Sequence, residues 1–431
     1  MTTLTPARKA CNGRAEADAQ HARHDVQAGG PKKAGAAGAL GTNAKYVHTG
    51  PMDSRVQRFA LQSVSRSILP ESRTAKCLRI RAHNAEVQVW KSIEYRTAQY
   101  AGLQTCGSVW SCPICAAKIA ERRRVEVLAA MTAHKAQGGR VNLLTLTTPH
   151  QRADNLGELL AKQSKTLQSF WNDRQVKAVF KEMGTIGQIR ALEVTHGRKS
   201  PHNNGWHPHY HVLMFGGSGV DLRAFSKANM TDWRVRLYLR WAASCVRHGL
   251  GEPSYEHGLA LHDGSKAAAY AAKWGLEDEM TKGHTKKALH GETPFDFLRA
   301  VLADAADVQA RALFLEFATT FKGKRQLHWS HGLKALFAIE EATDEQLSKR
   351  IEERAVLLGL LTVDQWRDVL RVKGRATVLE IAAASSWHEV QRYLWFIEGA
   401  AKGVHLDAEM LAEARALLLP GEPHETHTKT A

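Results

Sequence analysis

The stretch that most constrains this chain is "WHPHYHVLMF", where His207, His209 and His211 stand at every second position before an apolar run. Successive side chains of a β-strand point to opposite faces, so a strand here would project all three imidazoles from one face. A lone buried histidine is usually a hydrogen-bonded core residue. Three neutral imidazoles on one face each need a partner, and this pattern therefore predicts a metal site.

Two more strands are predicted before this one. The first is "RVNLLTLTTPH", Arg140–His150, and the second is "IGQIRALEVTHG", residues 186–197. The polar turn "RKSPHNNG" leads from the second strand into the histidine strand, which predicts a hairpin with Glu193 near the histidines. A carboxylate beside paired histidines suits transition metals and manganese better than magnesium, although a site that also takes phosphate oxygens accepts either ion. Glu193 is therefore the natural third ligand.

Helical patterns surround these strands. A long helical stretch is predicted at about 156–183 and another at 231–249, whereas 259–276 reads as a strand end, a turn and a helix that begins near Ser265. Beyond about residue 338 the pattern is helical throughout. The apolar run "AVLLGLLTV", residues 355–363, is too short for a membrane span and fits a buried helix.

The cysteines are clustered in "CGSVWSCPIC", where Cys106, Cys112 and Cys115 precede the basic helix "AAKIAERRRVEV". Zinc in a structural site takes four ligands, and Cys77 is the best fourth candidate, with His83 as a substitute. This spacing predicts a zinc ion that staples the basic helix. The alternative is a set of buried cysteines without a metal. Two other cysteines lie apart: Cys11 is incidental, and Cys245 belongs to a helix core.

The charge of the chain is uneven. The net charge is +16, but residues 338–431 hold 11 Lys and Arg against 16 Asp and Glu, a net of −5, so the first 337 residues carry +21. This balance predicts nucleic acid as partner. Residues 1–52 read as a flexible basic tail because they hold few large apolar groups. We find no signal peptide and no apolar run that could span a membrane, and the default expectation is a cytoplasmic protein without membrane contact.

Several motifs in order along the chain resemble those of rolling-circle plasmid replication initiators, a group of the His-hydrophobic-His endonucleases. "HPHYHVLMF" resembles their metal motif, "LLTLTTPH" their first motif and "ALEVTHG" the strand with an acidic residue. "SKAAAYAAKW" resembles the helix that carries the nucleophilic tyrosine, and "KGKRQLHWSHGLK" a segment after the catalytic core. The cysteine pattern also recurs in that group. The resemblance covers roughly residues 77–334.

Carried over by position, the resemblance makes His209 and His211 metal ligands and Tyr270 the nucleophile, with Lys273 one helical turn away to stabilise the phenolate or the phosphate. His207 precedes the matched pair and is either a further ligand or a phosphate contact. His150 is a candidate phosphate contact or a turn residue. Some members of the group carry a tyrosine or glutamate where this chain has Lys266. That departure indicates a single-tyrosine mechanism.

The predicted fold is α+β, a central antiparallel sheet with flanking helices, preceded by a small zinc-binding module and followed by a helical C-terminal region. The expected divisions are a tail at 1–52, the zinc module at 53–125, the endonuclease core at 126–337 and the helical region at 338–431. The predicted cofactors are Mn²⁺ or Mg²⁺ for catalysis and Zn²⁺ for structure.

The expected function is a replication initiator that nicks and rejoins one strand at a plasmid or phage origin through a 5′-phosphotyrosine, with host helicase and polymerase as candidate partners. One alternative is a relaxase or single-strand transposase with the same chemistry. Another is a zinc-dependent DNA-binding regulator without catalysis.

Overall fold

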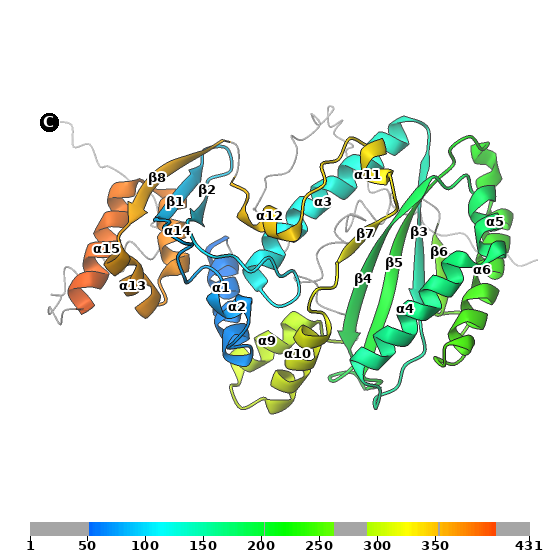
Figure 1. The fold of residues 1–431 in the computed structure, drawn as a ribbon, viewed down its shortest axis with the longest axis horizontal. Helices are drawn as coiled ribbons and strands as arrows, with labels where there is room; N and C mark the ends of the chain where they lie inside the picture. Colours follow the sequence, from blue (N-terminus) through cyan, green and yellow to red (C-terminus); the bar gives the residue numbers. More distant parts are fainter. Residues whose placement is uncertain (1–50, 202, 263–290, 352–353, 402–431) are drawn as a thin grey trace, which may run out of the picture. The chain divides into compact units, whose positions relative to one another are not determined.

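A computed structural model describes residues 51–201, 203–262, 291–351 and 354–401 (Figure 1). The main sheet has five antiparallel strands in the order β6-β3-β5-β4-β7. In chain order these strands are β3 (Arg140–Thr147), β4 (Gly187–His196), β5 (Trp206–Gly216), β6 (Leu259–His262) and β7 (Leu327–Trp329). The histidine strand is therefore central, and the predicted β4–β5 hairpin is confirmed.

Helices pack on both faces of this sheet. On one face, Trp206, Tyr210, Val212 and Met214 of β5 join a core with α4 (Leu156–Asn172), α5 (Arg174–Glu182) and α6 (Lys227–Arg247). On the other face, Leu213 and Phe215 pack against α3 (Pro113–Ala136) and Leu333. Because side chains alternate along β5, its three histidines lie on the same face as Leu213 and Phe215. Helix α3 covers that face at the C-terminal end of the strand.

The predicted helical stretch at 156–183 is two helices. Asp173 has an extended backbone, and its carboxylate accepts hydrogen bonds from the backbone N–H groups of Gln175 and Val176. A side chain that caps a helix N-terminus in this way favours a new start over continuation. The break turns α5 towards α6, where Arg240 also binds Asp173 at 2.8 Å.

Further helices stand beside the main sheet and around the cysteine region. They are α1 (Pro51–Ile68), α2 (Arg73–Lys76), η1 (Leu222–Phe225), α9 (Pro294–Ala303), α10 (Val308–Thr320), α11 (Leu333–Leu336) and α12 (Asp344–Lys349). Arg198, at the end of β4, forms ion pairs with Glu292 at 2.8 Å and with Asp307 at 2.7 Å. These pairs tie the hairpin to the segment around α9 and α10. In the part of the chain that the structure describes, no helix is long and apolar enough to cross a membrane.

A second sheet corrects the prediction for the C-terminal region. Residues 355–361 form a strand, β8 (Ala355–Leu361), not a buried helix, and it pairs with β1 (Val87–Ser92), which also pairs with β2 (Thr97–Ala101). Helix α13 (Val363–Arg371) begins only after Thr362, whose side chain caps it. Pairing with the free edge of β1 outweighs the helical preference of leucine and alanine in this run, a tertiary effect that local propensity does not contain.

The segments that we assigned to a zinc module and to a C-terminal region share this sheet and its core. Val87 and Val89 pack with Leu361 and Trp366, together with α14 (Arg375–Ala384) and α15 (Trp387–Ala401). The domain boundaries stay a prediction, and the tail at 1–52 lies outside the described residues except for Pro51 and Met52 at the start of α1.

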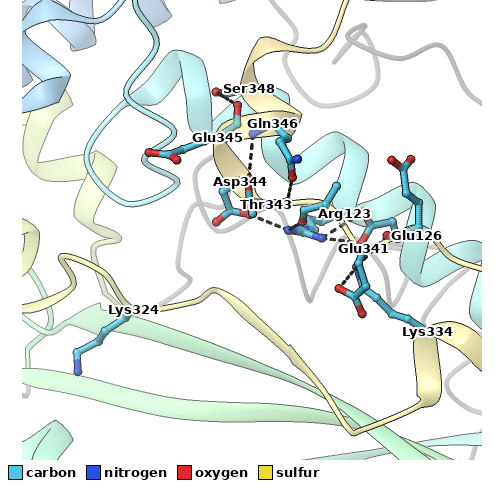
Figure 2. A network of polar contacts seen from close by, with 12 residues as sticks. Arg123, Glu126, Lys324, Lys334, Glu341, Thr343, Asp344, Glu345, Gln346 and Ser348 are labelled. Carbon is cyan, nitrogen blue, oxygen red and sulfur yellow. Dashed lines mark hydrogen bonds and ion pairs between the residues drawn. The ribbon is translucent and has the colours of Figure 1, made fainter.

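The arginines of the basic helix α3 contact the protein itself. Arg123 binds Asp344 at 2.9 Å, Glu126 at 2.9 Å and the carbonyl of Ala342 (Figure 2). Lys334, whose side chain is 5% exposed, approaches Glu126 at 3.2 Å from α11. This network holds α3 against the segment around α11 and α12. Arg123 of the basic helix therefore stabilises the fold.

Four cysteines meet where α2, the loop after β2 and the start of α3 converge. The Sγ atom of Cys77 lies 3.5 Å from that of Cys115 and 3.8 Å from that of Cys112, and Cys106 lies 3.6 Å from Cys115. Four sulfurs bound tetrahedrally to zinc, each about 2.3 Å from the ion, lie about 3.8 Å apart. Among the described residues these cysteines form no disulfide, and His83 is not part of the group.

Two polar side chains connect this group to the C-terminal helices. Gln62 of α1 donates to the carbonyl of Cys77 at 2.9 Å and to Cys112 Sγ at 3.6 Å, and it accepts from Arg375 at 2.7 Å. Arg375 is buried, donates to the carbonyl of Leu78 at 3.1 Å and interacts electrostatically with Cys77 and Cys112. Such outer contacts orient metal ligands and balance their charge. The donor set therefore fits zinc, with α14 as part of its support.

We expect Cys112→Ser to lose a single zinc ion per chain and to unfold the region around residues 77–125, because structural zinc contributes its binding free energy to folding. The measurement is zinc content with limited proteolysis. Cys245→Ser is the matched control: Cys245 is also buried but lies outside the group, so that variant should keep its zinc. The assignment would be contradicted if wild-type protein, purified in buffer without chelator, contained no zinc.

We expect Arg123→Met to lower the free energy of unfolding by roughly 2–3 kcal/mol, since it removes the hydrogen bonds to Glu126, Asp344 and the Ala342 carbonyl and leaves Lys334 as the remaining cation at Glu126. Arg367→Met, which breaks an exposed pair with Asp364, should cost under about 0.5 kcal/mol. Urea unfolding measures both values. Equal stability of the two variants would show that the α3 network contributes little.

Candidate functional site

The register of three strands places the candidate ligands side by side. Glu193 on β4 is paired with His209 on β5, and Thr145 on β3 is paired with His211. Residues paired directly across strands share a face, and His209 and His211 share it by alternation. The carboxylate predicted to stand near the histidines thus lies beside both of them.

The side chains converge on one point. The Oε2 atom of Glu193 lies 3.4 Å from Nε2 of His211 and 3.7 Å from Nε2 of His209. The ligand atoms of the three residues all lie within 4.8 Å of one another, and their side chains are 11–15% exposed. This spacing leaves room for one ion bound to all three.

The other ring nitrogens of both histidines have partners. Nδ1 of His209 lies 3.3 Å from the carbonyl oxygen of His207, which can only accept, so Nδ1 carries the proton and the Nε2 lone pair is left for a cation. Nδ1 of His211 lies 3.2 Å from the hydroxyl of Thr145. A hydrogen bond at the second ring nitrogen is what fixes the tautomer and orientation of a metal-ligating histidine.

The group can hold a divalent metal ion. One carboxylate and two neutral imidazoles leave coordination positions for water or phosphate oxygens, and such a donor set accepts Mn²⁺ and related ions more readily than Mg²⁺. The donor chemistry therefore fits the ions that the sequence analysis named.

His207 and His150 extend the row of imidazoles without entering this group. Their rings stack with centroids 4.6 Å apart, and His207 lies next to His209 at 4.9 Å. Burial, with repulsion from His209 and His150, lowers the pKa of His207 to about 3, so its ring is neutral at physiological pH. Its buried Nε2 has no hydrogen-bond partner in the described parts of the chain. Both residues keep their predicted roles as candidates.

The predicted nucleophile Tyr270, with Lys273 and Lys266, lies outside the described residues. The chain reaches that segment from β6, which ends at His262 and pairs with β3, so Ala260 stands opposite Thr145. Tyr210, the nearest rival in sequence to the histidines, points to the opposite face. It packs in the core there with Arg190 over its ring, and burial raises its pKa.

Two supporting residues escaped the sequence analysis. Thr145 holds His211, and the alternation of "LLTLTT" in the predicted first strand was a signal that could have placed it on the histidine face. Gln163 of α4 is fully buried and donates to the carbonyl of Pro208 at 2.9 Å, between two of the histidines. A glutamine in an amphipathic helix does not by itself predict this contact, because Gln163 reaches Pro208 only when α4 packs on β5.

We expect His211→Ala to abolish Mn²⁺ binding at this group and Thr145→Val to weaken it roughly tenfold or more, the usual cost of losing a partner that orients a ligand. Titration of the full chain with Mn²⁺, followed by electron paramagnetic resonance, measures both affinities. His257→Ala, which removes an exposed histidine outside the group, is the control and should bind as the wild type does. Unchanged affinity in His211→Ala would show that the ion binds elsewhere.

Comparison with known proteins adds a likeness to replication proteins. Residues 99–226, under a third of the chain, match a family model described as "Replication protein". The matched segment contains Cys106, Cys112 and Cys115 as well as Glu193 and the histidines, and it ends before Tyr270.

Three curated relatives are similar to parts of the chain. "Protein rep" of Streptomyces lividans is 26% identical over 75% of this chain and 86% of its own length. A "Neomycin resistance protein" of Streptomyces cyanogenus is 31% identical over 28% of this chain and 32% of its own length. "Protein rep" of Staphylococcus aureus is 28% identical over 28% of this chain and 47% of its own length. No solved structure matches the chain. These similarities support a replication protein.

Proposed function

We propose that this protein is a rolling-circle replication initiator, which nicks one strand of a plasmid origin through a 5′-phosphotyrosine and rejoins strands by the reverse reaction. The observation that carries the proposal is the convergence of Glu193, His209 and His211 on the central strand. A regulator that only binds DNA has no need of such a group. The similarity to replication proteins gives independent support.

The reaction needs one bond to form and one to break. The hydroxyl oxygen of Tyr270 attacks the scissile phosphorus, the bond to the 3′ oxygen breaks, and the proton of the phenol ends on the 3′-hydroxyl that leaves. A divalent ion supplies positive charge to the non-bridging phosphate oxygens, which otherwise repel the nucleophile. Glu193, His209 and His211 would hold that ion, and Lys273 would stabilise the phenolate as it forms.

The same residues serve the joining step. A 3′-hydroxyl attacks the phosphotyrosine ester, which restores the phosphodiester and returns the phenol. Since Lys266 stands where some members of the group carry a second tyrosine or a glutamate, a single tyrosine would perform both steps. The 3′-hydroxyl released by nicking would prime a host polymerase in the cytoplasm, with a helicase opening the duplex.

We expect Tyr270→Phe to fold, to bind Mn²⁺ and DNA as the wild type does, and to lose nicking by at least about 10³-fold, because only the attacking oxygen is removed. A single-stranded origin oligonucleotide with Mn²⁺ should give a denaturant-resistant adduct in the wild type, and mass spectrometry should place its 5′-phosphate on Tyr270.

Tyr255→Phe is the matched control. Tyr255 is 40% exposed and packs against Tyr238, so that variant should nick at the normal rate. An adduct on any tyrosine other than Tyr270 would overturn the single-tyrosine mechanism. No adduct and no nicking by the wild type, with an origin fragment of the replicon and Mn²⁺, would overturn the enzymatic function.

A further inference from the structure

A cavity of about 410 Å³ lies away from the histidine group, between α1, α3 and the small sheet of β1, β2 and β8. Its lining comes from both ends of the described chain, from Arg55 and Arg58 of α1 to Leu379 of α14. Figure 1 labels α1, α3, α14 and the three strands of the small sheet. Ligand pockets in proteins commonly have volumes of roughly 300–1,000 Å³. The cavity is therefore large enough for a ligand with the size of a nucleotide.

The charged side chains at this cavity are mainly cations. Arg55 and Arg58 reach it from α1, Lys118 and Arg122 reach it from α3, and Glu121 is the acidic residue among the lining side chains. The carboxylate of Glu121 forms an ion pair with Arg124 at 2.8 Å, which does not line the cavity. The lining thus presents an excess of positive charge to whatever occupies it.

Within the described parts of the chain, two of these cations form no ion pair with a carboxylate, although Arg58 interacts electrostatically with Glu380. Arg58 forms no hydrogen bond or ion pair with any residue that the structure describes, whereas its neighbour Arg55 binds Glu380 at 3.0 Å. The Nζ atom of Lys118 donates to the neutral amide oxygen of Gln99 at 3.0 Å. Burial and repulsion from Arg55 lower the pKa of Arg58 to about 10, and burial with repulsion from Arg122 lowers the pKa of Lys118 to about 8.

Both side chains are partly buried, which is an unfavourable position for a cation that has no ion pair. A cation taken out of water without an anionic partner destabilises the folded state, and proteins rarely bury Lys or Arg unless they are paired. Strongly shifted charged groups that gather at a cavity are therefore candidates for a binding site. An anion that entered would supply the ion-pair partner that Arg58 and Lys118 lack among the described side chains.

The other residues that line the cavity suit a flat aromatic ring of a ligand. Its apolar part includes Phe59, Ala98, Leu103, Ile114 and Leu379. Ser92, Thr97 and Gln99 add hydroxyl and amide groups that can donate and accept hydrogen bonds. An apolar surface beside a cationic one matches a molecule with a flat, weakly polar base at one end and phosphate at the other.

We propose that this cavity binds a nucleoside phosphate, with Arg58 and Lys118 on the phosphate and the wall around Phe59 and Leu379 on the base. Such a ligand has two sources, a free nucleotide or one nucleotide of a DNA strand. This site is separate from the Glu193 group, and its occupancy needs neither the metal nor Tyr270. It would give the small sheet a binding role of its own.

The test uses the full chain without added divalent metal and three probes: pyrophosphate, dATP and a fluorescent four-nucleotide oligothymidylate. Dissociation constants are measured for the wild type and for Arg58→Gln, Lys118→Gln and Arg66→Gln. The last is a matched control, because Arg66 lies on the same helix and carries the same charge but is exposed. Thermal unfolding is measured for all four proteins.

We expect Arg58→Gln and Lys118→Gln to raise the dissociation constant roughly tenfold or more, the loss of a charge-assisted hydrogen bond, and Arg66→Gln to change it less than about twofold. Arg58→Gln should also keep or raise the melting temperature, because it removes a partly buried charge that has no ion pair among the described residues, whereas a purely structural arginine would lower it. Similar affinities for dATP and the oligonucleotide identify a free nucleotide. A tenfold preference for the oligonucleotide identifies a DNA strand.

Two results would overturn the proposal. One is that no probe binds the wild type more tightly than it binds both cavity variants. The other is that all three variants weaken binding equally, which would mean that the total charge of the protein is responsible and the cavity is not.

Discussion

The antiparallel register between β4 and β5 is the constraint on which the candidate centre depends. It pairs Glu193 with His209, and a shift by one residue would turn either strand's side chains to the opposite face. The same register buries Trp206, Tyr210 and Val212 against the helices on the other side. A one-residue shift in register would therefore expose these core residues and also separate the three candidate ligands. The chemistry of the centre is protected by the packing behind it.

Support for that register comes from outside the sheet. Gln163 of α4 holds the carbonyl of Pro208, and Arg198 fixes the end of β4 through Glu292 and Asp307. Neither residue touches the three ligand atoms. Both keep the strand ends in place where the polar turn between β4 and β5 gives little packing of its own. The centre is thus held by contacts with α4 and with the segment around α9 and α10.

Much of this arrangement can be read from the sequence, for a physical reason. The period of two in "WHPHYH" and the strand before it act locally, so the hairpin and the meeting of Glu193 with two histidines follow from alternation alone. The cysteine spacing likewise indicates one group of thiols. The strand at Ala355–Leu361 could not be predicted in this way, because its partner is the edge of β1, far away in the chain. The same holds for Arg123, whose carboxylate partner Asp344 becomes visible only once α12 lies against α3.

The pairing of β8 with β1 has a consequence for synthesis. Ribosomes deliver the chain from its N-terminus, so β1 and β2 emerge long before the strand that completes their sheet. Until Leu361 has left the ribosome, the edge of β1 has unsatisfied backbone groups, and Val87 and Val89 lack much of their cover. An unpaired apolar edge is prone to associate with other chains. The five-stranded sheet, whose strands all precede residue 330, can close earlier. The small sheet beside the cysteine region can therefore be completed only after β8 has been synthesised.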